Sequence, residues 1–140
     1  MNEAIQVIKM NPVQNVDQLI QAIVTKAVKE GITTDSAALT DGLKTREQLG
    51  LTRIAEQVVL PHVLGTYILK NTVLIYHLTQ PIDWVDGNLV STVIVLLMAG
   101  PDSLIDTFLG VIADEQKLAY ISNPQTGVHD VQKLMLEERN

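Results

Sequence analysis

Gln57-Val58-Val59-Leu60-Pro61-His62 is a short apolar run that ends in a proline and a histidine. Its apolar residues favour a strand, because valine is β-branched. Pro61 has no backbone N–H to donate, and it biases Leu60 towards an extended conformation. The pattern predicts that the strand ends here and delivers His62 to the rim of a sheet. A neutral imidazole at such a rim can act as a nucleophile near pH 7.

Two helices are expected before this run. Apolar residues recur with helical spacing over residues 16–28, between a predicted N-cap at Asn15, with Gln18 at the capping-box position, and a predicted C-cap at Gly31. The second helix is predicted over residues 37–49, with Arg46 near its end. An arginine in a last helical turn usually complements the helix dipole and stays in solvent, so this interpretation stands beside any functional one.

Strands and helices continue to alternate along the chain. Strands are predicted over residues 5–8, 72–78 and 89–98, and residues 80–87 are expected to form a loop anchored by Trp84. Three further helical segments are expected: one that starts at residues 100–103, a short one that ends near residue 121 and a last one over residues 128–135. The interleaving predicts an α/β fold, a single-domain sandwich over residues 1–140 with helices on both faces. The short connection at residues 84–88 permits an antiparallel pair, so the sheet should be mixed.

Composition excludes several classes of function. The chain has 140 residues, a net charge of −6 and no cysteine, so disulfides, thiolate zinc sites and cysteine nucleophiles are ruled out. The lack of a Lys/Arg cluster argues against nucleic acid and anionic membranes as partners. No signal peptide is expected at the start, and the longest apolar run, residues 93–99, is too short to cross a membrane. We therefore expect a cytoplasmic protein with no direct membrane insertion.

Familiar catalytic motifs are missing from the sequence. It contains no phosphate-binding glycine loop, no zinc-type histidine spacing and no Gly-x-Ser-x-Gly elbow, so neither a metal nor an organic cofactor is expected. Of the other histidines, His77 falls inside a predicted strand and is interpreted as structural or surface-exposed, and His129 is expected in solvent on a helix turn. The residues alone thus leave His62 at a strand end without an identified reaction.

The order of these features resembles the enzyme IIA domains of the bacterial phosphoenolpyruvate-dependent sugar phosphotransferase system, fructose/mannitol class. The matching features are Leu43-x-x-Arg46-Glu47, then Thr52, then the apolar strand before Pro61-His62, and finally Pro81-Ile82-Asp83-Trp84 followed by Asp86-Gly87. The resemblance covers roughly residues 5–136.

The resemblance implies a role for three residues. His62 would accept a phosphoryl group from the phosphocarrier protein HPr and pass it to a IIB component during sugar uptake. Arg46 matches the family's arginine and would stabilise the transferring oxygens while keeping His62 neutral. Ser103 stands where many members carry a second active-site histidine and is a possible phosphate contact.

The sequence also departs from the family pattern. Where the family usually has small residues and glycines before Pro-His, this chain has Arg53, Ala55, Gln57 and Val59. A serine at position 103 can donate a hydrogen bond to phosphate but cannot carry a positive charge. An alternative function therefore stays open, that of a non-catalytic enzyme IIA-like regulatory or interaction module.

Overall fold

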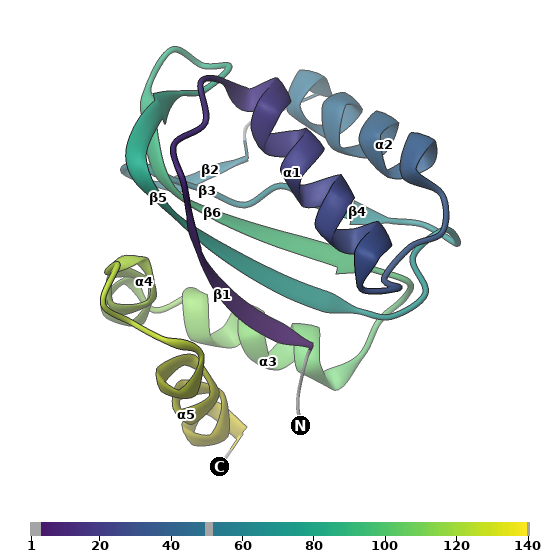
Figure 1. Cartoon of the computed structure of the whole chain (residues 1–140). Helices are drawn as coiled ribbons and strands as arrows, with labels where there is room; N and C mark the ends of the chain where they lie inside the picture. The colour runs from purple at the N-terminus through teal and green to yellow at the C-terminus, as the bar shows by residue number, and fades with distance from the viewer. Residues whose placement is uncertain (1–3, 50–51, 140) are drawn as a thin grey trace.

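A computed structural model describes residues 4–49 and 52–139 (Figure 1). The strands of this part of the chain form one mixed sheet in the order β1-β5-β6-β3-β2, with β4 also paired to β6. The strands are β1 (Ile5–Met10), β2 (Arg53–Ala55), β3 (Val58–Val59), β4 (His62–Leu64), β5 (Thr72–Asp83) and β6 (Leu89–Met98). β5 and β6 are antiparallel, whereas β1 runs parallel to β5, and both β3 and β4 run parallel to β6. The predicted mixed sheet is confirmed.

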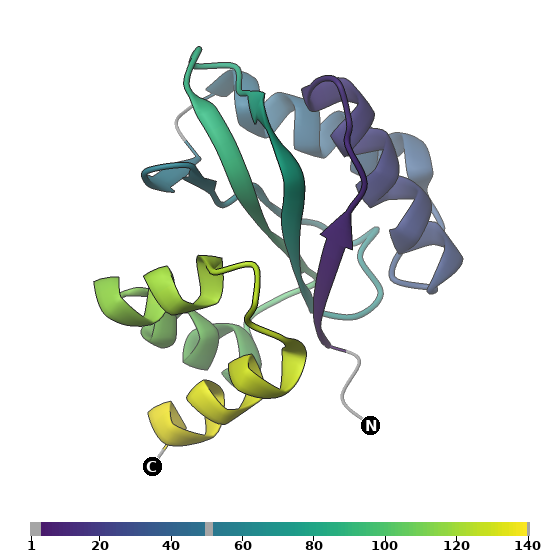
Figure 2. The same ribbon diagram turned by 60° about the vertical axis from the view of Figure 1, so that its left-hand side comes forward.

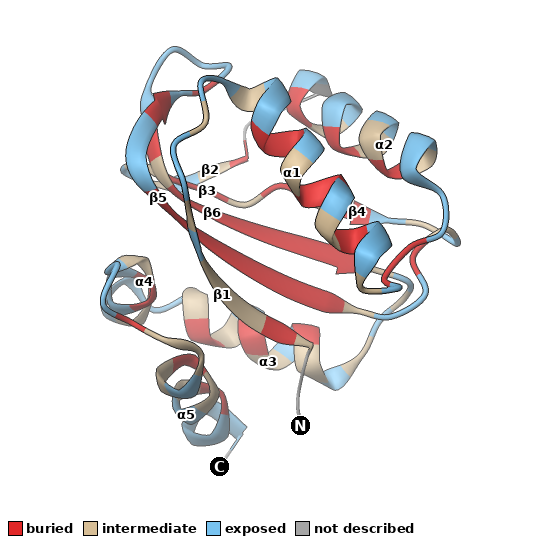
Figure 3. Cartoon of the chain, viewed as in Figure 1, coloured by how far each residue is buried: buried red, intermediate tan, exposed pale blue. Residues whose placement is uncertain are grey.

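Helices cover both faces of the sheet, as expected. The helices α1 (Val16–Lys29) and α2 (Ser36–Leu49) lie on one face, and α3 (Ser103–Ile112), α4 (Glu115–Ser122) and α5 (Val128–Arg139) lie on the other (Figures 1 and 2). The central strands β5 and β6 are buried along most of their length (Figure 3). Their side chains alternate between two apolar cores, one beneath each helical layer. The unbroken apolar run predicted for residues 89–98 reflects this burial on both faces.

α1 begins and ends close to where the sequence predicts, although the capping-box bond of Gln18 goes to Gln14 in place of Asn15 and the C-cap is Glu30. The Asn15 side chain accepts a hydrogen bond from the backbone N–H of Gln18 at 2.9 Å, and the Gln18 side chain accepts one from the backbone N–H of Gln14 at 2.9 Å. Gly31, just past the helix, has a φ of +73°, a conformation that glycine adopts without strain. Local sequence therefore sets both ends of this helix.

The Pro-His stretch differs from its prediction in one respect. β3 ends at Val59, before Pro61, but His62 is not left beyond the last strand, because it is the first residue of β4. The two strands pair in succession with β6, with Val59 opposite Val93 and His62 opposite Leu96. Pro61 interrupts the ladder only locally, since its carbonyl still accepts a hydrogen bond from the backbone N–H of Leu96.

The prediction of a loop over residues 80–87 is wrong at its start. β5 continues to Asp83, so Pro81 and Ile82 belong to the strand. The register with β6 shifts between His77 and Ile82, and this irregularity is where a strand can hold a proline that donates no hydrogen bond. Pro81 therefore lies at a change of register inside β5, where the sequence pattern predicts a loop.

Gln57 connects β2 to β3 with a φ of +62°, the left-handed region that costs a non-glycine residue about 1–3 kcal/mol. Its carbonyl accepts hydrogen bonds from the backbone N–H groups of Ser91 and Thr92, which hold the turn in place. Gln57→Gly should therefore raise the free energy of unfolding by about 1 kcal/mol, after allowing for the greater freedom of glycine in the unfolded chain. Urea unfolding checks this value. Glu56→Gly, at the neighbouring residue, should lower it, and a lower value for Gln57→Gly would show that the turn carries no strain.

Candidate functional site

A cleft of about 400 Å³ lies between α2 and β4. Its lining includes Asp41, Gly42, Arg46, His62, Leu64 and Tyr67. Two of the three residues predicted for the site, Arg46 and His62, thus share one cleft, although one comes from α2 and the other from β4.

His62 is half-buried, and its ring is held in one tautomer. The Nδ1 atom lies 3.1 Å from the carbonyl oxygen of Leu60. Because a carbonyl only accepts hydrogen bonds, Nδ1 must carry the proton of the neutral ring. The lone pair is then on Nε2, which makes Nε2 the nucleophilic nitrogen. Leu60 and His62 flank Pro61, the residue that separates β3 from β4.

Arg46 lies in the last turn of α2 and is half-buried. Its Nε atom is buried and has no hydrogen-bond partner among the residues that the structure describes. A guanidinium that only complemented the helix dipole would lie in solvent with its donors hydrated. A half-buried guanidinium that lines the same cleft as a histidine is better suited to bind an anion brought into that cleft.

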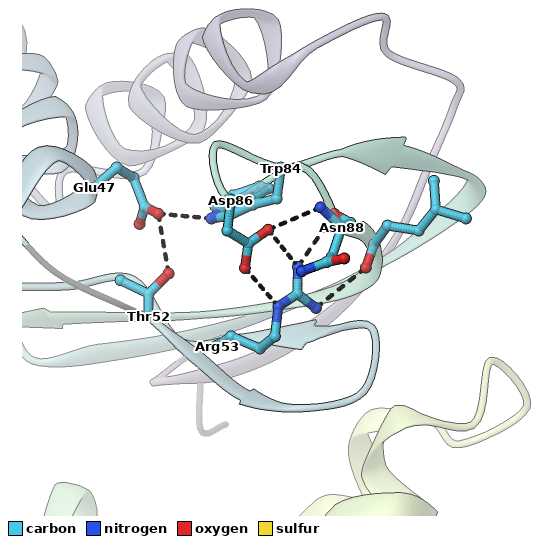
Figure 4. Close-up of polar contacts among 7 residues, drawn as sticks. Glu47, Thr52, Arg53, Trp84, Asp86 and Asn88 are labelled. Atoms are coloured by element: carbon cyan, nitrogen blue, oxygen red, sulfur yellow. Dashed lines mark hydrogen bonds and ion pairs between the residues drawn. The ribbon is translucent and has the colours of Figure 1, made fainter.

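The next residue, Glu47, ties the end of α2 to Thr52 and Trp84 (Figure 4). Its buried carboxylate oxygen Oε1 accepts hydrogen bonds from Trp84 Nε1 at 2.6 Å and from Thr52 Oγ1 at 3.0 Å. Burial raises the pKa of the Glu47 carboxyl, and these two hydrogen bonds oppose the rise. The interpretation of Trp84 as a loop anchor is confirmed. By holding Glu47, this cluster also sets the direction of the turn that carries Arg46.

A second polar cluster ties the β2–β3 hairpin to the turn between β5 and β6 (Figure 4). Arg53 donates to both carboxylate oxygens of Asp86, from Nε at 2.7 Å and from Nη2 at 2.9 Å. It also donates to the backbone carbonyls of Asn88 and Leu89. The hydrogen bonds from Arg53 lower the pKa of Asp86 to about 2. Arg53 thus ties the β2–β3 hairpin to the neighbouring turn.

The structure does not place Ser103 in the cleft of His62 and Arg46. Ser103 begins α3, whose N-cap is Asp102, and lines a different cavity together with Ile5, Met135 and other residues of α5. This position gives no support to a phosphate contact by Ser103, which stays a prediction.

The other two histidines lie apart from the cleft. His77 is buried in β5 and donates from Nε2 to the carbonyl of Ile121 at 2.8 Å, so it has the structural position considered for it. His129 is exposed in the first turn of α5, as expected. Only His62 combines an accessible ring with a neighbouring cation in the cleft.

Sequence reasoning missed Tyr67, which lines the cleft beside His62. The signal that pointed to it was Gly42, a glycine in the interior of α2 that propensity alone disfavours. A Cβ atom at Gly42 would lie 2.5 Å from the Tyr67 hydroxyl oxygen. A glycine at that helical position therefore indicates that another group approaches the helix closely.

Residues 4–49 and 52–139 do not form two other kinds of site. No group of three His, Cys, Asp or Glu side chains in these ranges could hold a metal ion. No helix there is long and apolar enough to cross a membrane.

Comparisons with known proteins place the chain in a family. Residues 2–137 match the family described as phosphoenolpyruvate-dependent sugar phosphotransferase system, EIIA 2. Among solved structures, nitrogen regulatory protein IIA-Ntr from Neisseria meningitidis is similar with a TM-score of 0.71 and 18% identity, covering 95% of this chain and 93% of that one. None of the curated proteins matches the sequence.

Two Escherichia coli structures share the fold as well. The complex of enzyme IIAMTL with phosphorylated enzyme IIBMTL matches with a TM-score of 0.69 and 17% identity, covering 96% of this chain and 95% of that one. The crystal structure of IIA mannitol matches with a TM-score of 0.67 and 17% identity, covering 95% and 96%. On the match over residues 2–137, the chain belongs to the EIIA 2 family of the phosphoenolpyruvate-dependent sugar phosphotransferase system, a family of phosphotransferase components.

Proposed function

We propose that this protein is a phosphoryl carrier that accepts phosphate from HPr on His62 and passes it to a IIB component of a sugar permease. The observation that carries the proposal is the pairing of His62 and Arg46 in one cleft, with the His62 ring held so that Nε2 is unprotonated. Membership of the EIIA 2 family supports it, as does the likeness to the mannitol IIA structure seen in complex with a phosphorylated IIB.

The chemistry requires little more than these groups. Phosphoryl transfer depends mainly on positioning and on stabilising the charge of the transferring oxygens. The Nε2 lone pair of His62 forms a bond to phosphorus as the bond between phosphorus and the donor's nitrogen breaks, and that electron pair returns to the donor. The proton on Nδ1 stays in its hydrogen bond to Leu60 throughout. Arg46 faces the negative oxygens with a fork of N–H donors.

The proposal is tested by reconstituting the transfer. The chain is incubated with phosphoenolpyruvate, enzyme I and HPr, and its intact mass is followed. It should gain one phosphoryl group, and the group should leave when purified IIB components of the fructose/mannitol class are added. A chain that gains nothing, while HPr in the same tube is phosphorylated, would contradict the carrier function.

A second candidate is a regulatory module that binds partners without carrying phosphate. Two points favour it: the likeness to a nitrogen regulatory IIA-Ntr protein, and the presence of Arg53 and Gln57 before Pro61, where the family resemblance implies small residues. The same reconstitution separates the two functions, because a non-catalytic module stays unlabelled. Retention of both Arg46 and His62 in one cleft favours the carrier.

A further inference from the structure

Tyr67 occupies a space that two glycines leave open. A Cβ atom at Gly42, in α2, would lie 2.5 Å from the Tyr67 hydroxyl oxygen, and one at Gly65, after β4, would lie 2.8 Å from Cδ1 of the same ring. Both distances are far below normal carbon contacts. The ring is therefore wedged between the helix and the loop, with its hydroxyl end against α2. The backbone is held too, because the Tyr67 carbonyl accepts a hydrogen bond from Thr33 Oγ1 at 2.6 Å.

The hydroxyl lies on the part of α2 that Arg46 reaches. Gly42 and Arg46 are four residues apart, so they share one face of the helix, and helical side chains lean towards the N-terminal turn. The place of the absent Gly42 side chain is also 3.3 Å from Val63 Cγ1, on the residue that follows His62. α2 thus makes a close approach to β4 at Gly42. Tyr67, Arg46 and His62 converge on the same cleft from three segments of the chain.

The hydroxyl is a neutral donor without a partner. Among the residues that the structure describes, no group accepts a hydrogen bond from the Tyr67 hydroxyl, although the ring that carries it is wedged in place. Partial burial, together with the negative charges of Asp41 and Asp35, raises the pKa of Tyr67, so the phenol keeps its proton at neutral pH. A fixed donor in the cleft that His62 and Arg46 share needs no reorganisation when an anion arrives.

We propose that the Tyr67 hydroxyl donates a hydrogen bond to the phosphoryl group on its way to His62 Nε2, as a neutral partner to Arg46. This inference rests on the proposed carrier function. In the step itself, the nitrogen–phosphorus bond to the donor breaks as the bond to Nε2 forms, and Tyr67 keeps its proton. Its hydrogen bond strengthens as negative charge gathers on the oxygens.

Tyr67→Phe tests the hydroxyl, because it keeps the wedged ring and removes only the donor. The rate of phosphoryl transfer from phosphorylated HPr is measured by rapid quench over a range of HPr concentrations. A lost hydrogen bond to a charged group predicts a saturated rate about tenfold lower. The HPr concentration at half-saturation and the midpoint of thermal unfolding should stay unchanged. Tyr120→Phe, an exposed tyrosine of α4 on the other face of the sheet, is the matched control and should transfer normally.

The outcomes separate this inference from the carrier function. A labelled wild-type chain with a normal rate for Tyr67→Phe would overturn the donor role alone, as would a loss confined to Tyr67→Leu, which removes the ring. A wild-type chain that takes no phosphate would overturn the carrier function and this inference with it. A lower rate for Tyr67→Phe that came with a lower unfolding midpoint would show a structural role in place of a donor.

Discussion

Arg46→Ala is expected to slow phosphoryl transfer to His62 by about 100-fold, the effect of removing one positioned donor or cation from a charged transition state. The free energy of unfolding should change by less than about 1 kcal/mol. The change in stability should be small because Arg46 makes no ion pair within the described part of the chain and leaves its Nε buried without a partner. Rapid-quench transfer from phosphorylated HPr and urea unfolding measure the two quantities.

Two other variants sharpen the interpretation of Arg46. Lys44→Ala removes an exposed cation of the same helix and should transfer at the wild-type rate, which controls for net charge. Arg46→Lys should recover only part of the rate, because an ammonium group lacks the planar fork that binds two oxygens at once. Normal transfer by Arg46→Ala would show that this arginine is only part of the surface.

Glu47→Ala is expected to lower the free energy of unfolding by about 3 kcal/mol. Removal of the carboxylate leaves two buried donors, Trp84 Nε1 and Thr52 Oγ1, without their acceptor and opens space at the end of α2. Urea unfolding gives the value, and Gln48→Ala, at the exposed neighbour on the same helix, serves as the control. An unchanged stability for Glu47→Ala would show that these hydrogen bonds do not hold the helix end.

The pH dependence of the same site is opposite in sign to that of an ion-paired carboxylate. Since burial raises the pKa of Glu47 in the folded protein, the folded state favours the protonated carboxyl. Its contribution to stability is therefore full below the unfolded pKa, about 4.3, and is lost as the pH rises through the folded pKa. Glu47→Gln, which keeps an acceptor and cannot ionise, should gain stability relative to wild type as the pH rises from about 4 to 7. A difference that stays constant or shrinks over this range would contradict the assignment.

The sequence predicts the elements of this fold better than it predicts their pairing. Helix ends are local, so Asn15 and Gly31 were enough to predict both limits of α1. The prolines were harder to interpret, because Pro81 lies inside β5 at a shift of register and Pro61 separates two strands that both pair with β6. Their effect depends on whether a neighbouring strand tolerates a missing donor, and local sequence does not carry this information.

The candidate site also combines features that the sequence predicts with features that depend on tertiary packing. The sequence pattern and the family resemblance led to His62 and Arg46, and the structure adds what brings them together. The close approach of α2 to β4 depends on a glycine, Gly42, whose reason is a ring from Tyr67, 25 positions further along the chain. The tautomer of His62 depends on a backbone carbonyl, which every sequence has. Such features arise from tertiary packing and leave only indirect signs in the sequence.

The carrier function is tested most directly by finding which atom of the chain carries the phosphoryl group. The protein, labelled with ¹⁵N in its histidines, is phosphorylated through enzyme I and HPr, and the coupling between ¹⁵N and ³¹P is recorded by NMR at alkaline pH, where a phosphohistidine persists. We expect coupling to Nε2 of His62, loss of the signal in acid, no signal in His62→Ala and an unchanged signal in His129→Ala. Phosphorus on Nδ1 of His62, on another histidine or still present in His62→Ala would contradict it.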